Sequence, residues 1–204
     1  MGMGTNANYQ GRVEDDRLIT GQGRYVADLA MDQLAHAFVV RSPYAHGALA
    51  LLDTSDAAAA EGVLAVYTAE DLARACVGAF PCVVKFPRPD GQEPFPAGRR
   101  VLAADRVRHL GEGVALIVAE TRAQAVAAAE LISVEVDEAP VAVTAELALA
   151  PDAPLVWDVV PGNSALPWCQ GAFYAVDEAI SGEHHVARIK SHVTRVSANT
   201  MEPR

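Results

Sequence analysis

The stretch VALIVAETRAQAVAAAELISVEV, residues 114–136, decides the fold class of this 204-residue chain. Its opening VALIVA is a continuous apolar run, which is typical of a buried strand. Thr121 and Gln124 then match the T-x-x-Q capping box that begins a helix, and we expect this helix to reach Leu131. The closing ISVEV alternates between apolar and polar side chains, as a half-buried strand does. The order of these elements predicts a β-α-β unit, whose crossover should be right-handed.

Upstream of this unit, short strands alternate with short helices. Three runs of apolar and β-branched residues predict strands, at residues 34–41, 48–53 and 63–67. Thr54 and Ser55 are good caps for a helix between the second and third strands, and Gly62 ends that helix. Thr68 begins another short helix, with Asp71 as its capping-box partner. The whole pattern predicts an α/β layer rather than a helical bundle.

The first 28 residues predict little regular structure. Residues 1–10 predict an arm without fixed structure, and they lack the basic segment and apolar core of a secretory signal. Residues 11–28 are charged and are then interrupted by Gly21 and Gly23, which predicts extended chain with a tight turn and no helix. No apolar run reaches the roughly 18 residues that a membrane-spanning helix needs.

Two proline-rich stretches divide the rest of the chain. Residues 78–100 contain five prolines and predict a long loop, which is our candidate for a contact with a partner. A second stretch predicts a domain boundary that includes a linker at residues 147–164. Beyond it we expect a helix at residues 173–180 and, from alternating apolar and polar side chains, a half-buried strand at residues 185–193.

Composition limits the function classes. With 16 basic and 26 acidic residues the formal charge is −10, which disfavours nucleic acids and anionic membranes as partners. Three cysteines, Cys76, Cys82 and Cys169, form no C-x-x-C pair, so we interpret each as a small buried apolar residue in a reducing compartment. These features predict a cytoplasmic protein.

The residues that could carry chemistry form no catalytic set. Gly21-Gln22-Gly23 lacks the third glycine and the following helix of a dinucleotide-binding turn. His184 and His185 are adjacent, so on a strand they would point to opposite faces and could not bind one metal together. Glu112 and Glu183 each follow a glycine, and we interpret both as solvated turn residues. The residues alone therefore predict no catalytic residue and no metal site, and they identify no cofactor-binding residue.

Five stretches of the sequence, taken in order, resemble the large subunits of the molybdenum hydroxylases. This family contains xanthine dehydrogenase, aldehyde oxidase and aerobic carbon monoxide dehydrogenase. The stretches are GRVEDDRLITGQGRYVADL (11–29), FVVRSPYAHGAL (38–49), GVLAVYTAEDL (62–72), residues 102–143, and VTRVSANTMEPR (193–204). The sequence departs from the usual family pattern at Tyr44, at Gly113 in the turn Gly111-Glu112-Gly113, and at Ala172.

The resemblance implies a fold and a division into domains. Residues 20–146 would form the α/β hammerhead domain, preceded by an N-terminal arm at residues 1–19. After the linker at residues 147–164, residues 165–204 would be the truncated start of a molybdopterin-binding domain.

The resemblance also implies an activity for the complete enzyme. Such a subunit uses a molybdopterin-type molybdenum cofactor to hydroxylate an aldehyde, an N-heterocycle or a CO-like substrate with oxygen from water, with a glutamate as base. Electrons pass to a 2Fe-2S small subunit and an FAD-binding medium subunit, which are the implied partners together with the remainder of the large subunit. The family's Phe-Gly loop and its Gly-x-Gly-Glu base do not occur in this chain, since Gly111-Glu112 and Gly182-Glu183 both lack the first glycine of that motif. We therefore expect the isolated chain to be inactive and to bind no cofactor by itself. Glu202 and Arg204 would lie near the core of the cofactor domain, where a structural pairing is the simpler role.

Two other readings remain open. The chain could be a stand-alone, non-catalytic docking or assembly module with the hammerhead fold. A small dinucleotide-binding enzyme is disfavoured because the glycine fingerprint is missing.

Overall fold

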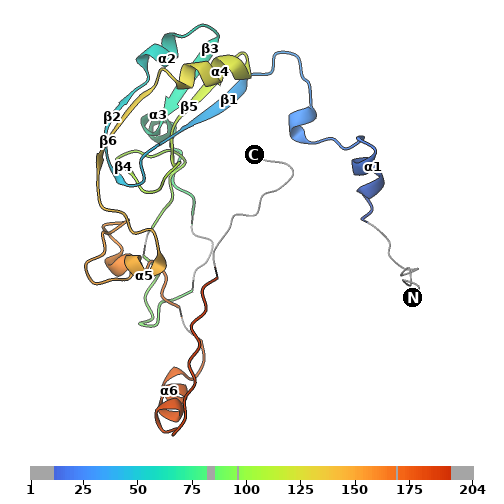
Figure 1. The fold of residues 1–204 in the computed structure, drawn as a ribbon. Helices are drawn as coiled ribbons and strands as arrows, with labels where there is room; N and C mark the ends of the chain where they lie inside the picture. The colour runs from blue at the N-terminus through green and yellow to red at the C-terminus, as the bar shows by residue number, and fades with distance from the viewer. Residues whose placement is uncertain (1–11, 82–85, 96, 169, 194–204) are drawn as a thin grey trace, which may run out of the picture. The chain divides into compact units, whose positions relative to one another are not determined.

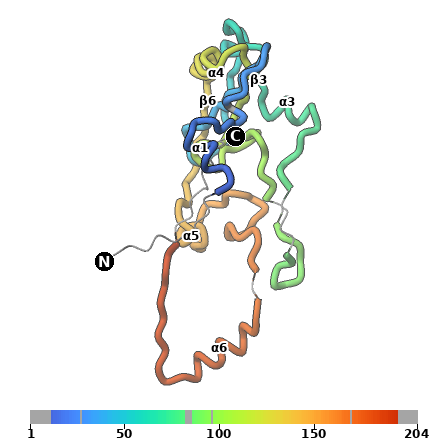
Figure 2. The backbone as a smooth tube through the Cα atoms, turned by 90° about the vertical axis from the view of Figure 1, so that its right-hand side faces the viewer, coloured from blue at the N-terminus to red at the C-terminus, as the bar shows by residue number. Residues whose placement is uncertain are grey.

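A computed structural model describes residues 12–81, 86–95, 97–168 and 170–193 of the chain. These residues fall into two compact units. One contains residues 12–34 and 187–193, and the other, called the body below, is Ala35–Val186; the path of the chain through each can be followed in Figure 1 and Figure 2. The predicted arm at residues 1–10 and the residues Glu202 and Arg204 lie outside the described residues.

The body contains two three-stranded antiparallel sheets. The first sheet has the order β1-β5-β3, with strands β1 (His36–Arg41), β5 (Gly113–Ala119) and β3 (Val63–Thr68). The second has the order β4-β2-β6, with strands β4 (Arg106–Val107), β2 (Gly47–Asp53) and β6 (Ser133–Glu138). The predicted strands before residue 70 are confirmed, and so are the two strands of the deciding stretch.

The predicted pairing of those last two strands is wrong. Helix α4 (Arg122–Ala129) does connect β5 to β6, but the two strands lie in different sheets. Both neighbours of β5 are antiparallel to it, and β6 pairs antiparallel with β2. Periodicity gave the types of the elements correctly, but it contains no information about which strand pairs with which. The chain therefore forms an α+β arrangement of antiparallel sheets, with no parallel β-α-β unit among the described strands.

The predicted helix caps are mostly confirmed. The hydroxyl oxygen of Thr121 accepts a hydrogen bond from the backbone N–H of Gln124 at 3.2 Å, and it donates to the side-chain oxygen of Gln124 at 2.7 Å. Helix α2 (Ser55–Ala59) begins differently, because Thr54 makes no capping bond and Asp53 accepts from the backbone and hydroxyl of Ser55 instead.

Helix α3 (Ala69–Arg74) has the full capping box predicted from Thr68 and Asp71. The Asp71 carboxylate accepts from the backbone N–H of Thr68 at 2.8 Å and from its hydroxyl at 3.0 Å. These bonds lower the pKa of Asp71 below its ordinary value of 3.8. The bond from the backbone N–H has the larger effect, and the bond from the hydroxyl has the next largest. Both bonds favour the ionised carboxylate, because a carboxylate accepts hydrogen bonds more strongly than a carboxylic acid.

This pKa shift predicts a defined pH dependence. Because the folded pKa lies below the unfolded one, the capping box stabilises the fold fully above about pH 4. That contribution is lost as the pH falls through the lowered folded pKa. Asp71→Asn should therefore lower the urea midpoint at pH 7 and lose most of this effect near pH 2. Glu70→Gln is the control, since it removes a neighbouring carboxylate outside the capping box. An Asp71→Asn effect that is equally large at both pH values would contradict the assignment.

The core lies where the inner faces of the two sheets meet helices α2 and α4. Many of its fully buried members come from β5 and from small residues of the helices; they include Val114, Ala115, Ile117, Ala119, Ala57, Ala125 and Ala128. Phe38 and Val66 flank Ile117 in the register of the first sheet, and Leu52 and Val134 join from the second. Alanines at the helix positions allow the helices to approach the sheet closely.

The proline-rich loop has a packing role inside the body. Phe80 and Arg99 form an isolated antiparallel bridge. Apart from this bridge, the described part of residues 78–100 contains no strand and no helix, as predicted. The backbone N–H of Phe95 donates to the carbonyl of Ala165 at 3.0 Å, and the Phe86 ring lies 5.7 Å from that of Trp168. The loop is therefore attached to the segment at residues 165–168.

The end of the described chain is only partly as predicted. Helix α6 (Phe173–Ser181) confirms the expected helix. The strand expected at residues 185–193 is wrong: these residues are all exposed and belong to no sheet. Alternation alone does not make a strand, because a strand also needs a neighbour to receive its backbone hydrogen bonds. The proposed domain limits remain a prediction.

The expectation that residues 11–28 contain no helix is wrong. Residues 15–19 form a short helix, α1 (Asp15–Ile19), where extended chain was expected, and η1 (Val26–Asp28) is a single 3₁₀ turn. The Asp15 carboxylate accepts from the backbone N–H of Arg12 at 2.8 Å, and the Thr20 hydroxyl donates to the carbonyl of Asp16 at 2.6 Å. Local side-chain bonds at both ends thus support a turn of helix. The turn predicted at Gly21 is present, with φ of 70°.

Candidate functional site

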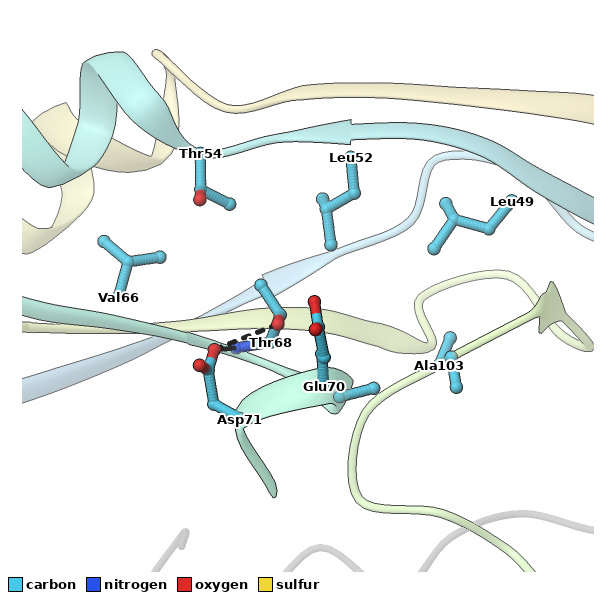
Figure 3. A pocket seen from close by; sticks show the side chains of 10 residues that line it. Leu49, Leu52, Thr54, Val66, Thr68, Glu70, Asp71 and Ala103 are labelled. Carbon is cyan, nitrogen blue, oxygen red and sulfur yellow. Dashed lines mark hydrogen bonds between the residues drawn. The ribbon is translucent and has the colours of Figure 1, made fainter. Parts of the chain in front are cut away.

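A hollow of about 540 Å³ opens between the two sheets of the body. In Figure 3, Leu49, Leu52 and Thr54 of the β2 segment lie on one side, and Thr68, Glu70 and Asp71 lie on the other. The full lining is Leu49, Leu52, Thr54, Val66, Thr68, Ala69, Glu70, Asp71, Ala103 and Ala104. The hollow is thus an open end of the core, lined by apolar side chains together with two threonines and two carboxylates.

The charges at the hollow have their own partners. Arg74 of α3 lies 2.5 Å from the Glu70 carboxylate and 3.1 Å from that of Asp71. The other Asp71 oxygen is occupied by the capping box. Two carboxylates with one arginine leave a net negative charge, and no basic side chain is among the ten that line the hollow. The site therefore offers no pair of free carboxylates for acid–base work.

Two arginines fasten the segment after α5 (Ala145–Ala148) to the body. The guanidinium of Arg108 lies 4.1 Å from the centre of the Trp157 ring, and Arg106 forms an ion pair with Asp158 at 3.2 Å. Because both arginines lie at β4 and both partners are adjacent, the four residues act as one clamp, called the arginine clamp below. It contains a cation–π contact, which is worth about 0.5–2 kcal/mol.

A second fastening follows in the same segment. The side chain of Asn163, in η2 (Pro161–Asn163), accepts from the backbone N–H of Val156 at 2.9 Å. It also donates to the carbonyls of Ala148 and Pro154, at 3.0 and 2.9 Å. The side-chain amide of Asn163 thus makes three hydrogen bonds to the backbone and holds the segment in a compact loop, in which Val160 is buried.

Removal of the tryptophan from the arginine clamp should loosen this segment selectively. In Trp157→Ala we expect backbone amides at residues 149–163 to exchange with solvent about 10-fold faster or more, since a loss of about 1–2 kcal/mol of local stability has this effect. Amides of β5 should be unchanged. The measurement is hydrogen exchange followed by mass spectrometry. Trp168→Ala is the matched control, because Trp168 contacts Phe86 instead, and faster exchange at 149–163 there would contradict the clamp.

The prediction that Glu112 is a solvated turn residue is wrong. Its side chain is buried, and it accepts a hydrogen bond from the backbone N–H of Arg108 at 2.6 Å. The carbonyl of Glu112 accepts from the N–H of Ser42 at 2.8 Å, and Gly111 N–H donates to the carbonyl of Ser42 at 3.0 Å. Glu112 therefore closes the turn before β5 and joins it to the Arg41–Ser42 bend, which is a structural role. Glu183 is exposed, as expected.

The remaining candidates are not brought together. His46 is buried, with Nδ1 at 3.0 Å from the carbonyl of Pro140, while His184 and His185 are exposed. Cys76 is also exposed, which is contrary to the expected buried position, because it lies in a turn with φ of 56° after α3. Cys82 and Cys169 fall outside the described residues. Within the described ranges, no three His, Cys, Asp or Glu side chains form a group that could hold a metal ion.

The hollow does not fit a molybdopterin cofactor. Such a cofactor carries a phosphate, and burial of an anion beside Glu70 and Asp71 without a basic partner is unfavourable. Sequence reasoning missed the hollow because it depends on the pairing of the two sheets, although the Thr68 and Asp71 capping motif did mark one of its walls. Across the part of the chain that is described, no helix has the length and apolar character to cross a membrane.

The comparisons with known proteins agree on one group of relatives. Residues 20–140 match the sequence model of the aldehyde oxidase and xanthine dehydrogenase a/b hammerhead domain. The chain is 36% identical over 193 residues to the nicotine 6-hydroxylase large subunit of Paenarthrobacter nicotinovorans, covering 95% of this chain and 23% of that protein. It is 36% identical over 154 residues to the carbon monoxide dehydrogenase large chain of Hydrogenophaga pseudoflava, covering 74% and 18%.

A solved structure shows the same likeness. Quinoline 2-oxidoreductase from Pseudomonas putida 86 superposes with a TM-score of 0.58 at 38% identity, over 68% of this chain and 17% of that one. The chain therefore spans about a quarter or less of the length of these relatives.

Proposed function

The chain belongs to the aldehyde oxidase and xanthine dehydrogenase family through its hammerhead domain, and we propose that it forms the N-terminal part of the molybdenum-cofactor subunit of a hydroxylase. One observation carries this proposal. The likeness to the nicotine 6-hydroxylase large subunit extends over 95% of this chain, well beyond the hammerhead match, but takes up only 23% of that relative.

The proposed complete enzyme hydroxylates an aldehyde, an N-heterocycle or a CO-like substrate with oxygen derived from water. A bound molybdenum cofactor supplies the redox chemistry. Electrons then pass to a 2Fe-2S small subunit and an FAD-binding medium subunit. Since the hollow does not fit the cofactor, we place the cofactor site and the catalytic base in the remainder of the large subunit.

The contribution of this chain is then positional. The two sheets and their shared core form a rigid support, because Ile117 and its neighbours are fully buried. The arginine clamp and Asn163 fix the path of residues 148–163 on this support. The loop at residues 86–95 in turn holds residues 165–168. The body therefore sets the position from which the chain continues towards the proposed cofactor domain.

An activity comparison tests the proposal. We expect the isolated chain, purified from cells that make the molybdenum cofactor, to oxidise no aldehyde, N-heterocycle or CO with an artificial electron acceptor. The assembly purified from the source organism through a tag on this chain should oxidise one of these substrate classes. An assembly without any such activity and without the other subunits would instead support the stand-alone docking module.

A further inference from the structure

Both faces of the β1-β5-β3 sheet are largely apolar, which distinguishes this sheet from the β4-β2-β6 sheet. Its inner face contributes Phe38, Ile117 and Val66 to the core. Except for Arg41 at the end of β1, whose guanidinium donates to the carbonyl of Gly111, the alternate positions form a second apolar set on the outer face, and none of them belongs to the core. We call these six residues the outer apolar face: Ala37, Val39, Ala65, Tyr67, Leu116 and Val118.

The register brings these side chains into one continuous patch. Val39 and Tyr67 both pair with Leu116, and Ala37 and Ala65 both pair with Val118. Val39 is 37% exposed and Tyr67 is 42% exposed, so the described residues leave much of the patch uncovered. None of the six side chains carries a charge.

The β4-β2-β6 sheet, in contrast, has an apolar inner face and an outer face with charged residues. In the β2–β6 pair, the inner positions are Leu49, Leu52, Val134 and Val136, while Asp137 pairs with Ala48 and Glu135 with Leu51 on the outer face. Antiparallel sheets with one face in water show this alternation of apolar and polar residues. The run VALIVA of β5 shows no such alternation, which is typical of a strand that is covered on both faces.

We propose that the outer apolar face is the surface on which the remainder of the molybdenum-hydroxylase large subunit packs. This inference rests on the proposed function and adds the contact surface to it. The large subunits that the chain resembles continue as one polypeptide for more than three times the matched length, so a contact between this face and that remainder would be permanent. Permanent interfaces resemble the core of a domain, with few charges, whereas transient interfaces are about as polar as the rest of the surface. A patch of six uncharged side chains that includes an exposed tyrosine, with one arginine at its edge, fits the permanent class.

Photo-crosslinking in the assembled protein tests this surface. Tyr67 is replaced by p-benzoylphenylalanine, an aromatic of related shape, and the assembly is purified from the source organism and irradiated. We expect crosslinked peptides from the remainder of the large subunit. Leu51, which is 43% exposed on the polar outer face of the other sheet, is the matched control and should give no such crosslink.

Two charge variants supply a second readout. Tyr67→Lys should reduce the yield of assembled protein about 10-fold or more, which corresponds to about 1.4 kcal/mol, while Leu51→Lys should leave it unchanged. Both isolated variants should melt as the wild type does, because both positions are exposed. The melting temperatures of the isolated variants therefore show whether a lower yield of assembly comes from weaker docking or from a less stable fold.

The outcomes of these two experiments separate three claims: the occupant of the surface, the docking surface itself, and the proposed function. Tyr67 crosslinks to a second copy of this chain, or to the FAD or iron–sulfur subunit, would overturn the occupant proposed here. An intact, active assembly without Tyr67 crosslinks, with Tyr67→Lys assembling normally, would overturn the docking surface and leave the proposed function standing. A wild-type chain that is purified alone, without other subunits, would overturn both.

Discussion

Gly47→Val should be among the most damaging single substitutions in the body, with a loss of about 3 kcal/mol or more in the free energy of unfolding. Gly47 is the first residue of β2, where it pairs with Val107 on one side and Glu138 on the other. A Cβ atom at this position would lie 2.3 Å from the carbonyl oxygen of Asp137 and 2.6 Å from a methyl carbon of Val136. The clash is with backbone of the paired strand, so a rotamer change cannot relieve it.

The backbone angle at Gly47 adds to this cost, since its φ of 156° is uncommon for residues with a side chain. Gly91→Val is the matched control, because Gly91 also has a positive φ, of 76°, but its Cβ would meet open space. The two variants are compared by urea unfolding. A cost at Gly47 no larger than that at Gly91 would show that the β2–β6 pairing differs from the one described.

Ile117→Ala is expected to cost about 2–5 kcal/mol of stability, since Ile117 is fully buried at the centre of the core. Val118, the next residue of β5, lies on the outer apolar face and is only half-buried. Val118→Ala should therefore cost about 1 kcal/mol or less in the isolated chain. Thermal and urea unfolding of the two variants measure the difference between the two faces of one strand. Equal costs would contradict the assignment of Ile117 and Val118 to opposite faces.

The same pair also reports on the docking proposal. In the assembled protein, Val118 becomes a buried residue if the remainder of the large subunit covers it. Its truncation should then cost more in the assembly than in the isolated chain. The corresponding cost for Ile117 should be similar in both, because its surroundings do not change.

The local elements of the fold were predictable from the sequence, because local residues determine them. The T-x-x-Q box of Thr121 and the capping pair Thr68 and Asp71 predicted the starts of two helices, and apolar runs predicted the strands. The partners of those strands were not predictable from single-sequence patterns. A buried strand such as β5 looks the same whether its neighbours are parallel or antiparallel, and only the three-dimensional structure placed β5 and β6 in different sheets.

The candidate site was less accessible to sequence reasoning. Glu112 looked like an ordinary turn residue. Its carboxylate closes a local turn by accepting from the N–H of Arg108, but its carbonyl bonds to Ser42, which comes from a distant part of the chain. The strand expected at residues 185–193 had the right alternation but no neighbouring strand. The family, in contrast, was predictable, because five stretches of the sequence resemble it in the correct order, although none of them is decisive alone.

The most direct test of the central claim is the molybdenum content and subunit composition of the native protein. The chain is tagged in its source organism, purified under native conditions, and analysed by elemental and protein mass spectrometry. The proposed function predicts molybdenum and iron in the purified material, together with the remainder of the large subunit and with FAD-binding and 2Fe-2S subunits. A stable, folded chain that is recovered alone and without molybdenum would contradict it.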